Sequence, residues 1–267
     1  MTILAGICAA TSVALGAMFM FAAGAPRRYL LINFVALAVG VITASLTRRL
    51  PLRTPRFAGV VAITTGLVLG ATALFGVHIE GASRWVVVAG IALQPSLILL
   101  PAALVSFAPH RTWLSALGLI IAGGALALQP DRAMAGTLVA GVAALWLHRR
   151  ERPVTVALIV AIAGFASTLL HTDAVAPVLF VEHVVQSAFA FHGMLGVAVV
   201  VGLLTMLLPV AAGLHTRAAG RGVPMVFGAT WLTIIASALV GNYPTPLVGY
   251  GSSAIAGYCL SAALLPR

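Results

Sequence analysis

Long apolar runs separated by short polar segments fill the chain. An apolar helix needs about 20 residues to cross a bilayer, so this pattern predicts a series of membrane-spanning helices. The fourth and tenth runs are short, the eighth is long, and nine spans is the fallback count. We therefore predict an all-α fold, a polytopic transmembrane helical bundle of about ten spans, in one domain over residues 1–267. The predicted spans are 3–23, 29–46, 57–76, 93–108, 113–130, 133–147, 154–170, 185–212, 223–241 and 252–265.

Composition supports a membrane protein and not a soluble domain. Hydrophobic residues make up 61% of the chain and charged residues 7%, with a mean hydropathy of +1.12. Both values lie far from those of soluble globular domains. The first apolar run lacks a basic region before it, so we interpret it as a retained span and not as a cleaved signal peptide. Cys8 and Cys259 lie inside apolar runs, which gives no support to a disulfide framework.

The distribution of arginine predicts the orientation of the bundle. The chain has no lysine and a net charge of +10, and its arginines lie in short clusters between the apolar runs. With the N-terminus in the cytoplasm, the ten-span arrangement gives 11 inner and 4 outer arginines, in agreement with the positive-inside rule. We therefore expect an N-in/C-in, multi-pass protein and no nucleic-acid partner, because no aromatic residues are interleaved with the charge. The inner set is Arg48, Arg49, Arg53, Arg56, Arg111, Arg149, Arg150, Arg152, Arg217, Arg221 and Arg267, and the outer set is Arg27, Arg28, Arg84 and Arg132.

Acidic residues are scarce and gather on the predicted outer side. Of the 5 acids, Glu80, Asp131, Asp173 and Glu182 fall there. A carboxylate at a bilayer is costly unless it is paired, hydrated or functional. These acids and the outer arginines suggest a wet cleft open to the exterior, which suits a substrate with a charged head group and a lipid tail. The alternative is a set of ordinary interfacial residues at helix ends.

The first two candidate segments lie before the fourth predicted span and at the outer end of the fifth. In Gly81-Ala82-Ser83-Arg84-Trp85, the glycine allows a tight turn, the arginine can hold a phosphate, and the tryptophan suits the interface. Gln94-Pro95-Ser96 follows, and its proline can start a helix. In Gln129-Pro130-Asp131, the proline ends one helix and the aspartate can cap the next. The alternatives are an interfacial loop with a tryptophan anchor and a simple helix cap.

A third candidate segment is His171-Thr172-Asp173, followed by Glu182. We expect Thr172 or Asp173 to cap the eighth helix. On a continuous helix, Asp173 and Glu182 would point to opposite sides, so they do not form an obvious carboxylate pair. Glu182 is instead a structural acid that needs a buried partner, and His183, His192 or an arginine are the candidates.

The fourth candidate segment runs from Tyr243 to Ser253 and contains two prolines, two glycines and two serines. Irregular backbone at membrane depth is tolerated only where it is buried in protein or lines a water-filled cavity. Gly251, Ser252 and Ser253 can offer N–H and hydroxyl donors to an anion. The alternative is a re-entrant turn without a ligand.

Taken in order, these segments resemble the SEDS family of bacterial shape, elongation, division and sporulation proteins, the FtsW/RodA/SpoVE type. The resemblance covers residues 81–260. Leu97, Leu100 and Val181 stand where the family has Glu, Lys and Glu, and only about 18 residues separate Arg152 from His171, where the family has a longer stretch. The chain resembles a compact and divergent member. The matching residues are Gly81 to Trp85, Gln94 to Ser96, Gln129 to Asp131, His171 to Asp173, Glu182, and Pro246 to Ser253.

The resemblance implies a peptidoglycan glycosyltransferase that polymerises lipid II at the outer face of the bacterial cytoplasmic membrane, in cell division or cell-shape maintenance. It implies a class B penicillin-binding protein as partner. The family's essential aspartate falls on Asp173, which would act as general base. Arg84, Trp85, Asp131 and Gly251 to Ser253 are then the expected substrate-binding residues. No metal-ligating residues are expected, although a divalent cation is compatible with the diphosphate.

Two other functions stay open at the level of the sequence. One is a non-catalytic SEDS-like scaffold or binder of a lipid-linked precursor. The other is a lipid flippase or transporter, which inverted repeats and broken helices near the midplane would favour.

Overall fold

The computed structural model describes residues 1–49, 54–172, 175–215 and 221–266. Within these ranges the chain forms twelve helices and three short strands. The helices are α1 (Thr2–Ala22), α2 (Arg27–Arg49), α3 (Pro55–Phe75), α4 (Pro95–Phe107), α5 (Trp113–Leu128), α6 (Arg132–His148), α7 (Arg152–Thr168), α8 (Val184–Phe191), α9 (Gly193–Thr205), α10 (Leu208–His215), α11 (Gly222–Val240) and α12 (Ser252–Ala263). The strands are β1 (Val77–Ile79), β2 (Ala82–Val88) and β3 (Ile91–Leu93).

Side-chain caps set the start of several helices. The hydroxyl of Thr54 accepts a hydrogen bond from the N–H of Phe57 at the start of α3, and Thr112 caps α5 by the same geometry. Asp131 caps α6 through the N–H of Met134 at 3.2 Å, so the predicted cap is confirmed. Pro95 occupies the first turn of α4, where a missing N–H costs nothing, again as predicted.

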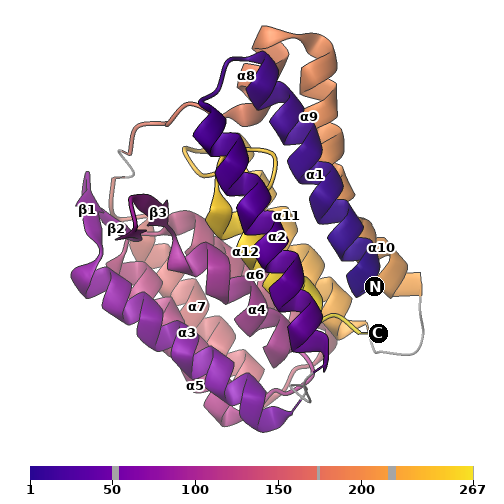
Figure 1. Ribbon diagram of the computed structural model, residues 1–267. Helices are drawn as coiled ribbons and strands as arrows, with labels where there is room; N and C mark the ends of the chain where they lie inside the picture. Colours follow the sequence, from indigo (N-terminus) through magenta and orange to yellow (C-terminus); the bar gives the residue numbers. More distant parts are fainter. Residues whose placement is uncertain (50–53, 173–174, 216–220, 267) are drawn as a thin grey trace.

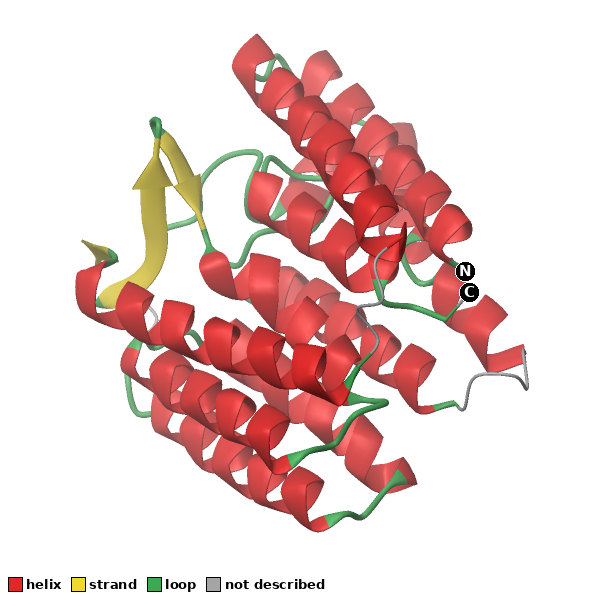
Figure 2. Cartoon of the chain, turned by 60° about the horizontal axis from the view of Figure 1, so that its bottom comes forward, coloured by secondary structure: helices red, strands yellow, loops and turns green. Residues whose placement is uncertain are grey.

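The helices pack in two groups around a central set. On one side α3, α5, α7 and α6 lie against one another, and on the other α1 packs on α2 and α9. The central helices α4, α11 and α12 join the two groups (Figure 1). The two ends of the chain lie close together (Figures 1 and 2).

Glycines bring helices into close contact at defined crossings. A Cβ atom added to Gly118 of α5 would lie 2.3 Å from the carbonyl carbon of Ala62 in α3. One added to Gly257 of α12 would lie 1.9 Å from the carbonyl oxygen of Leu97 in α4. Small residues at crossings of this kind allow membrane helices to approach backbone to backbone. The positions of the apolar residues alone therefore do not explain how these helices pack.

Residues 77–93 form an antiparallel sheet in the order β1-β2-β3, which corrects the expected interfacial loop around Gly81 to Trp85. Two-residue turns join the strands, at Glu80-Gly81 and Ala89-Gly90, and all four residues have positive φ. Such turns match the twist of a hairpin, and the β-branched Val86 to Val88 favour a strand. Figure 2 shows the sheet standing at one edge of the helical body.

The eighth predicted span is not one helix. The segment 185–212 is interrupted at His192, where α8 ends and α9 begins, and again between α9 and α10. The predicted cap for this helix at Thr172 or Asp173 is also wrong, because α8 begins at Val184 and its N-cap is His183. Asp173 itself lies outside the described residues.

Several described helices are long and apolar enough to cross a membrane. Five qualify by length and composition, namely α1, α2 over Arg27–Thr47, α3, the run Gly193–His215 and α11. Four shorter apolar helices, α4 to α7, lie among them. The chain is therefore a polytopic helical bundle, and the count of ten spans and the N-in/C-in orientation stay predictions.

Candidate functional site

A pocket of about 320 Å³ lies between the sheet, the loop before α8 and the start of α12. Segments far apart in the sequence form its wall, which is mostly apolar. The pocket thus brings three of the four candidate segments together at the end of the bundle that carries the sheet. The lining residues used below are Glu80, Trp85, Gln94, Leu97, Val175, Glu182, Thr245, Tyr250, Gly251, Ser252 and Ser253.

A buried polar network forms the base of the pocket. The carboxylate of Asp131 is fully buried and accepts hydrogen bonds from Gln94 Nε2 at 2.9 Å and Ser96 Oγ at 3.0 Å. The N–H of Gln94 donates to Ser253 Oγ at 2.9 Å, which ties β3 and α4 to the first turn of α12. Buried polar groups of this kind are stable only when paired, so the network fixes the position of the Gln94 side chain. Asp131 lies behind this glutamine and is not part of the pocket wall.

Arg84 also lies behind the wall. Its side chain is buried, and one guanidinium nitrogen donates to the carbonyl of Pro130. The guanidinium lies 5.9 Å from the ring centre of Trp85 and 5.6 Å from that of Tyr243. Aromatic rings at this distance stabilise a cation. Arg84 therefore positions Trp85, which does line the pocket, against the loop that carries Tyr243.

The loop before α8 covers the pocket and is held by the loop before α12. The N–H of Thr245 donates to Val181 O at 2.8 Å, and that of Tyr250 donates to Phe180 O at 2.6 Å. Two further contacts fix the start of the described part of this loop: Asn242 Nδ2 donates to Val175 O at 2.9 Å, and the N–H of Ala176 donates to Glu80. These contacts pair backbone groups in both irregular segments.

Glu182 lines the pocket and is 7% exposed. We expected its carboxylate to pair with a histidine or arginine side chain, but its hydrogen-bond partner is a backbone N–H. Its Oε2 accepts from the N–H of Val178 at 2.6 Å, while His183 pairs with Asn242. Burial raises the pKa of the Glu182 carboxyl above its usual value, against the opposing effects of backbone hydrogen bonds and of His183. The expected helical spacing between Asp173 and Glu182 does not apply, because residues 175–183 are not helical.

Asn33 of α2 holds the loop before α12 from both sides and was not singled out in the sequence. Its fully buried amide donates to Gly249 O at 2.9 Å and accepts from the N–H of Gly251 at 3.2 Å. Next to it, Tyr29 stacks on Tyr250 with ring centres 3.9 Å apart. A lone Asn inside an apolar run was the available signal, since a buried amide must find partners.

Two polar atoms at the pocket have no hydrogen-bond partner within the described residues. They are Gln94 Oε1 and Thr245 Oγ1, on side chains that are 5% and 4% exposed. Gly251 caps α12 without a side-chain hydrogen bond, so the first N–H groups of this helix also face the pocket end. Because both of these atoms are enclosed by protein, the groups that the site can offer to a ligand are the N–H groups at the start of α12 and the hydroxyl of Ser252.

Of the predicted site residues, Trp85, Glu182, Gly251, Ser252 and Ser253 line one pocket, with Arg84 and Asp131 directly behind it. Asp173 lies outside the described residues. Ligand binding by these residues stays a prediction. Among the residues that the structure describes, no group of three or more His, Cys, Asp or Glu side chains is placed to hold a metal ion.

Comparison with known proteins places the fold. No protein-family model and no curated protein sequence matches the chain. The rod shape-determining protein RodA of Thermus thermophilus superimposes with a TM-score of 0.71 at 23% identity, covering 97% of this chain and 93% of that one. An aspartate-to-alanine mutant of that protein gives 0.72 with the same identity and coverage.

A third solved structure agrees. A chain in a peptidoglycan synthase complex, studied for the coordination of polymerization and crosslinking, gives a TM-score of 0.66 at 22% identity, with 97% and 94% coverage. At this level of identity the similarity shows the fold. The chain is thus an integral membrane protein with a RodA-like fold.

Proposed function

We propose that this RodA-like protein is a peptidoglycan glycosyltransferase of the SEDS family, acting on lipid II at the outer face of the bacterial cytoplasmic membrane. The observation that carries the proposal is the single pocket at which the sheet, the Gln94 segment, the loop before α8 and the start of α12 meet. These are the segments whose sequences resemble the family, and they converge although up to 175 residues separate them, from Ile79 to Ala254.

The pocket suits the head of a lipid-linked substrate. Its volume holds a diphosphate and the adjoining part of a sugar, while the polyprenyl tail would lie along the exposed apolar helix faces. The N–H groups at the start of α12 and the Ser252 hydroxyl favour an anion there.

In the proposed reaction Asp173 is the general base. Its carboxylate accepts the proton of the acceptor hydroxyl as that oxygen attacks the anomeric carbon of the donor sugar. The bond from that carbon to the diphosphate oxygen breaks, and undecaprenyl diphosphate leaves with its charge near the α12 N-terminus. Asp173 precedes Val175 of the pocket wall by two residues. A divalent cation and a class B penicillin-binding protein partner belong to the same proposal.

The first experiment is the variant Asp173→Asn, assayed with purified lipid II in reconstituted membranes. We expect loss of polymer by at least about a hundredfold, the usual contribution of a general base, with an unchanged unfolding temperature. Glu151→Gln, at the opposite end of the bundle, is the matched control and should retain full activity. Equal polymer formation by Asp173→Asn and the wild type would contradict the proposal.

One observation favours a second function, that of a non-catalytic binder of the lipid-linked precursor. Leu97 lines the pocket where the family has a glutamate, so one acidic group is missing from the wall. This function predicts lipid II binding that survives Asp173→Asn, with no polymer from either protein. A binding assay beside the polymer assay therefore separates the two functions.

A further inference from the structure

A second, smaller pocket of about 160 Å³ lies at the opposite end of the bundle. It opens where α4 and α6 end and α11 begins. Of its lining residues Ala108, Pro109, Arg111, Leu145, His148, Arg149, Gly222 and Val223, three have basic side chains. None of these residues takes part in the site described above.

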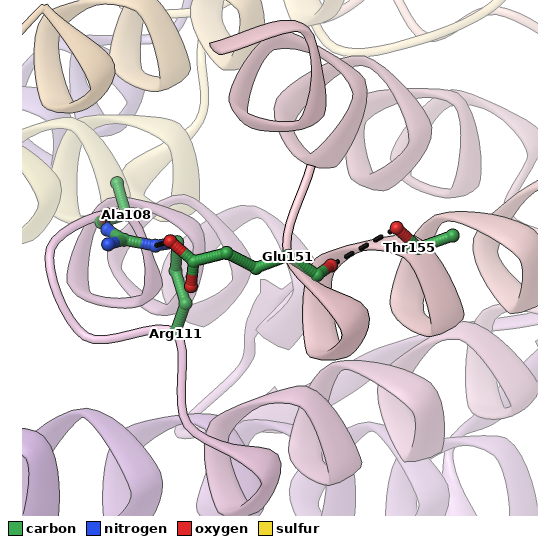
Figure 3. Close-up of polar contacts among 4 residues, drawn as sticks. All are labelled: Ala108, Arg111, Glu151 and Thr155. Atoms are coloured by element: carbon green, nitrogen blue, oxygen red, sulfur yellow. Dashed lines mark hydrogen bonds and ion pairs between the residues drawn. The ribbon is translucent and has the colours of Figure 1, made fainter. Parts of the chain in front are cut away.

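The basic side chains at this pocket are partly preorganised. Arg111 donates from Nη1 to the carbonyl of Ala108 and from Nε to Glu151 at 2.9 Å (Figure 3). Glu151 is in turn fixed, because its carbonyl accepts from Thr155 Oγ1 at 3.1 Å. The guanidinium is therefore held at the rim of the pocket by one carboxylate and one carbonyl, and His148 and Arg149 are exposed beside it.

The start of α11 contributes donors on the other side of the pocket. Gly222 and Val223 are its first two residues, and Arg221, its N-cap, makes no side-chain capping bond. N–H groups in the first turn of a helix have no partner within the helix, and the helix dipole favours an anion beside them. The pocket thus combines basic side chains with helix N–H donors, whereas Glu151 is the one carboxylate in its described surroundings and is already paired with Arg111.

The size and depth of the pocket select the ligand. Its volume of about 160 Å³ is large enough for a phosphate group. The pocket lies at the level where three helices end, and Trp113 and Trp146 flank this end as interfacial tryptophans do. Arg150 lies 4.8 Å from the ring centre of Trp146. Lipid phosphates occupy this depth of a bilayer.

We propose that this pocket binds the phosphate of an anionic phospholipid, between the ends of α4 and α6 and the start of α11. Arg149 and the rim guanidinium of Arg111 attract the anion, and the N–H groups of Gly222 and Val223 receive it. The positive-inside prediction places this end at the cytoplasmic leaflet, which carries the anionic lipids. The proposal is independent of the reaction at the other end of the molecule.

The experiment uses the full chain in phosphatidylcholine nanodiscs with or without phosphatidylglycerol. Thermal unfolding and native mass spectrometry of retained lipid are the readouts. We expect phosphatidylglycerol to raise the unfolding temperature of the wild type. We expect the Arg149→Gln variant to retain this lipid about fivefold more weakly than the wild type does. Arg152→Gln removes the same charge from the same end without touching the pocket, and it should behave as the wild type.

A second pair of variants blocks the pocket directly. Among the described residues, a Cβ atom at Gly222 meets only His148 and Leu145, each at 3.7 Å, which is ordinary van der Waals contact. Gly222→Asp places a carboxylate at the helix N-terminus, where it favours the helix but repels a phosphate. We expect loss of the phosphatidylglycerol effect in this variant and partial retention in the uncharged control Gly222→Asn.

Two results would overturn the proposal. Equal phosphatidylglycerol retention and equal stabilisation in the wild type, Arg149→Gln and Gly222→Asp would exclude this pocket as the site. If inorganic phosphate added to phosphatidylcholine nanodiscs stabilised the wild type and phosphatidylglycerol did not, the ligand would be a soluble phosphate and the lipid assignment would be wrong.

Discussion

Asn33 illustrates how one side chain can position a site to which it does not belong. Its amide connects α2 to Gly249 and Gly251, which are more than two hundred residues away in the sequence. The loop between these glycines carries Tyr250, a residue of the pocket wall. Without the amide, a buried carbonyl and a buried N–H would lose their partners, and each such loss costs about 1–3 kcal/mol.

We therefore predict that Asn33→Ala lowers the free energy of unfolding by about 2 kcal/mol and loosens the loop before α12. Denaturation of the purified protein measures the first effect, and hydrogen exchange over residues 245–251 measures the second. Ser45→Ala on the same helix is the control, because that exposed hydroxyl bonds only to Val41 of its own helix. If Asn33→Ala and Ser45→Ala lost the same stability, the two hydrogen bonds of the Asn33 amide would have no special role.

Glu182 leads to a prediction about pH. Since burial raises the pKa of its carboxyl, the folded protein binds the proton more tightly than the unfolded chain does. The resulting stability is fully present below the usual glutamate pKa and is lost as pH rises through the raised pKa. We expect Glu182→Gln to remove this part of the pH dependence, because its amide oxygen can still accept from Val178. Thermal unfolding measured across this pH range compares the wild type with Glu182→Gln. If the unfolding temperature of both proteins changed equally with pH, Glu182 would not be the source of this pH dependence.

At the scale of elements, helix crossings depend on glycines that the apolar pattern does not distinguish. Gly118 and Gly124 both lie on α5, yet only Gly118 contacts another helix closely. A Cβ at Gly118 would meet the backbone of Ala62 and Ile63, whereas none of the described residues has an atom within 4 Å of one at Gly124. Sequence patterns could predict this helix but not which of its glycines faces α3.

We predict opposite effects for alanine at these two positions. Gly118→Ala should lower the free energy of unfolding by about 1–3 kcal/mol, because the backbones must move apart. Gly124→Ala should be neutral or stabilising by up to ~1 kcal/mol, because alanine restricts the unfolded chain and favours a helix. Denaturation in the same detergent compares the two. Equal effects would mean that the crossing tolerates a methyl group.

The sheet shows why some elements escaped prediction from sequence. Glu80-Gly81 and Ala89-Gly90 are turn pairs on either side of a β-branched strand, which is a hairpin signal. The signal is weaker than the long apolar runs around it, so the segment was interpreted as an interfacial loop. For the same reason, the continuous apolar run predicts one span where the structure has α8, α9 and α10. The break between α8 and α9 lies at His192-Gly193.

At the scale of the molecule, the sequence predicted the helical bundle, and five of the candidate site residues line the pocket, namely Trp85, Glu182, Gly251, Ser252 and Ser253. Apolar length gave the helices, and the Pro, Gly and Ser residues after Tyr243 indicated the broken segment. Asn33 and the partner of Glu182 could not be predicted, because both depend on contacts between distant segments. Arg84 was expected at the ligand, but its position behind Trp85 depends on how β2 packs against the loop before α12.

The orientation of the bundle can be tested directly. The sheet and the basic pocket lie at opposite ends, so single cysteines at Val87 and Arg152 should be labelled from opposite sides of the membrane. We expect a membrane-impermeant maleimide added to intact spheroplasts to label Val87→Cys and not Arg152→Cys. Cys8 and Cys259 are buried and give little background. The reverse labelling pattern would invert the predicted orientation and place the candidate site in the cytoplasm.

The wall of the pocket beside the sheet is formed by residues between Ile79 and Ala254, and this affects biosynthesis. Ile79 and Trp85, on the strands, are synthesised in the first third of the chain, whereas Ser252 and Ser253 are synthesised close to its end. Until then the N–H of Gln94 lacks its acceptor, and α4 lacks the helix that crosses it at Gly257. A nascent or truncated protein without its final helix can therefore insert most of its spans and still have no completed site.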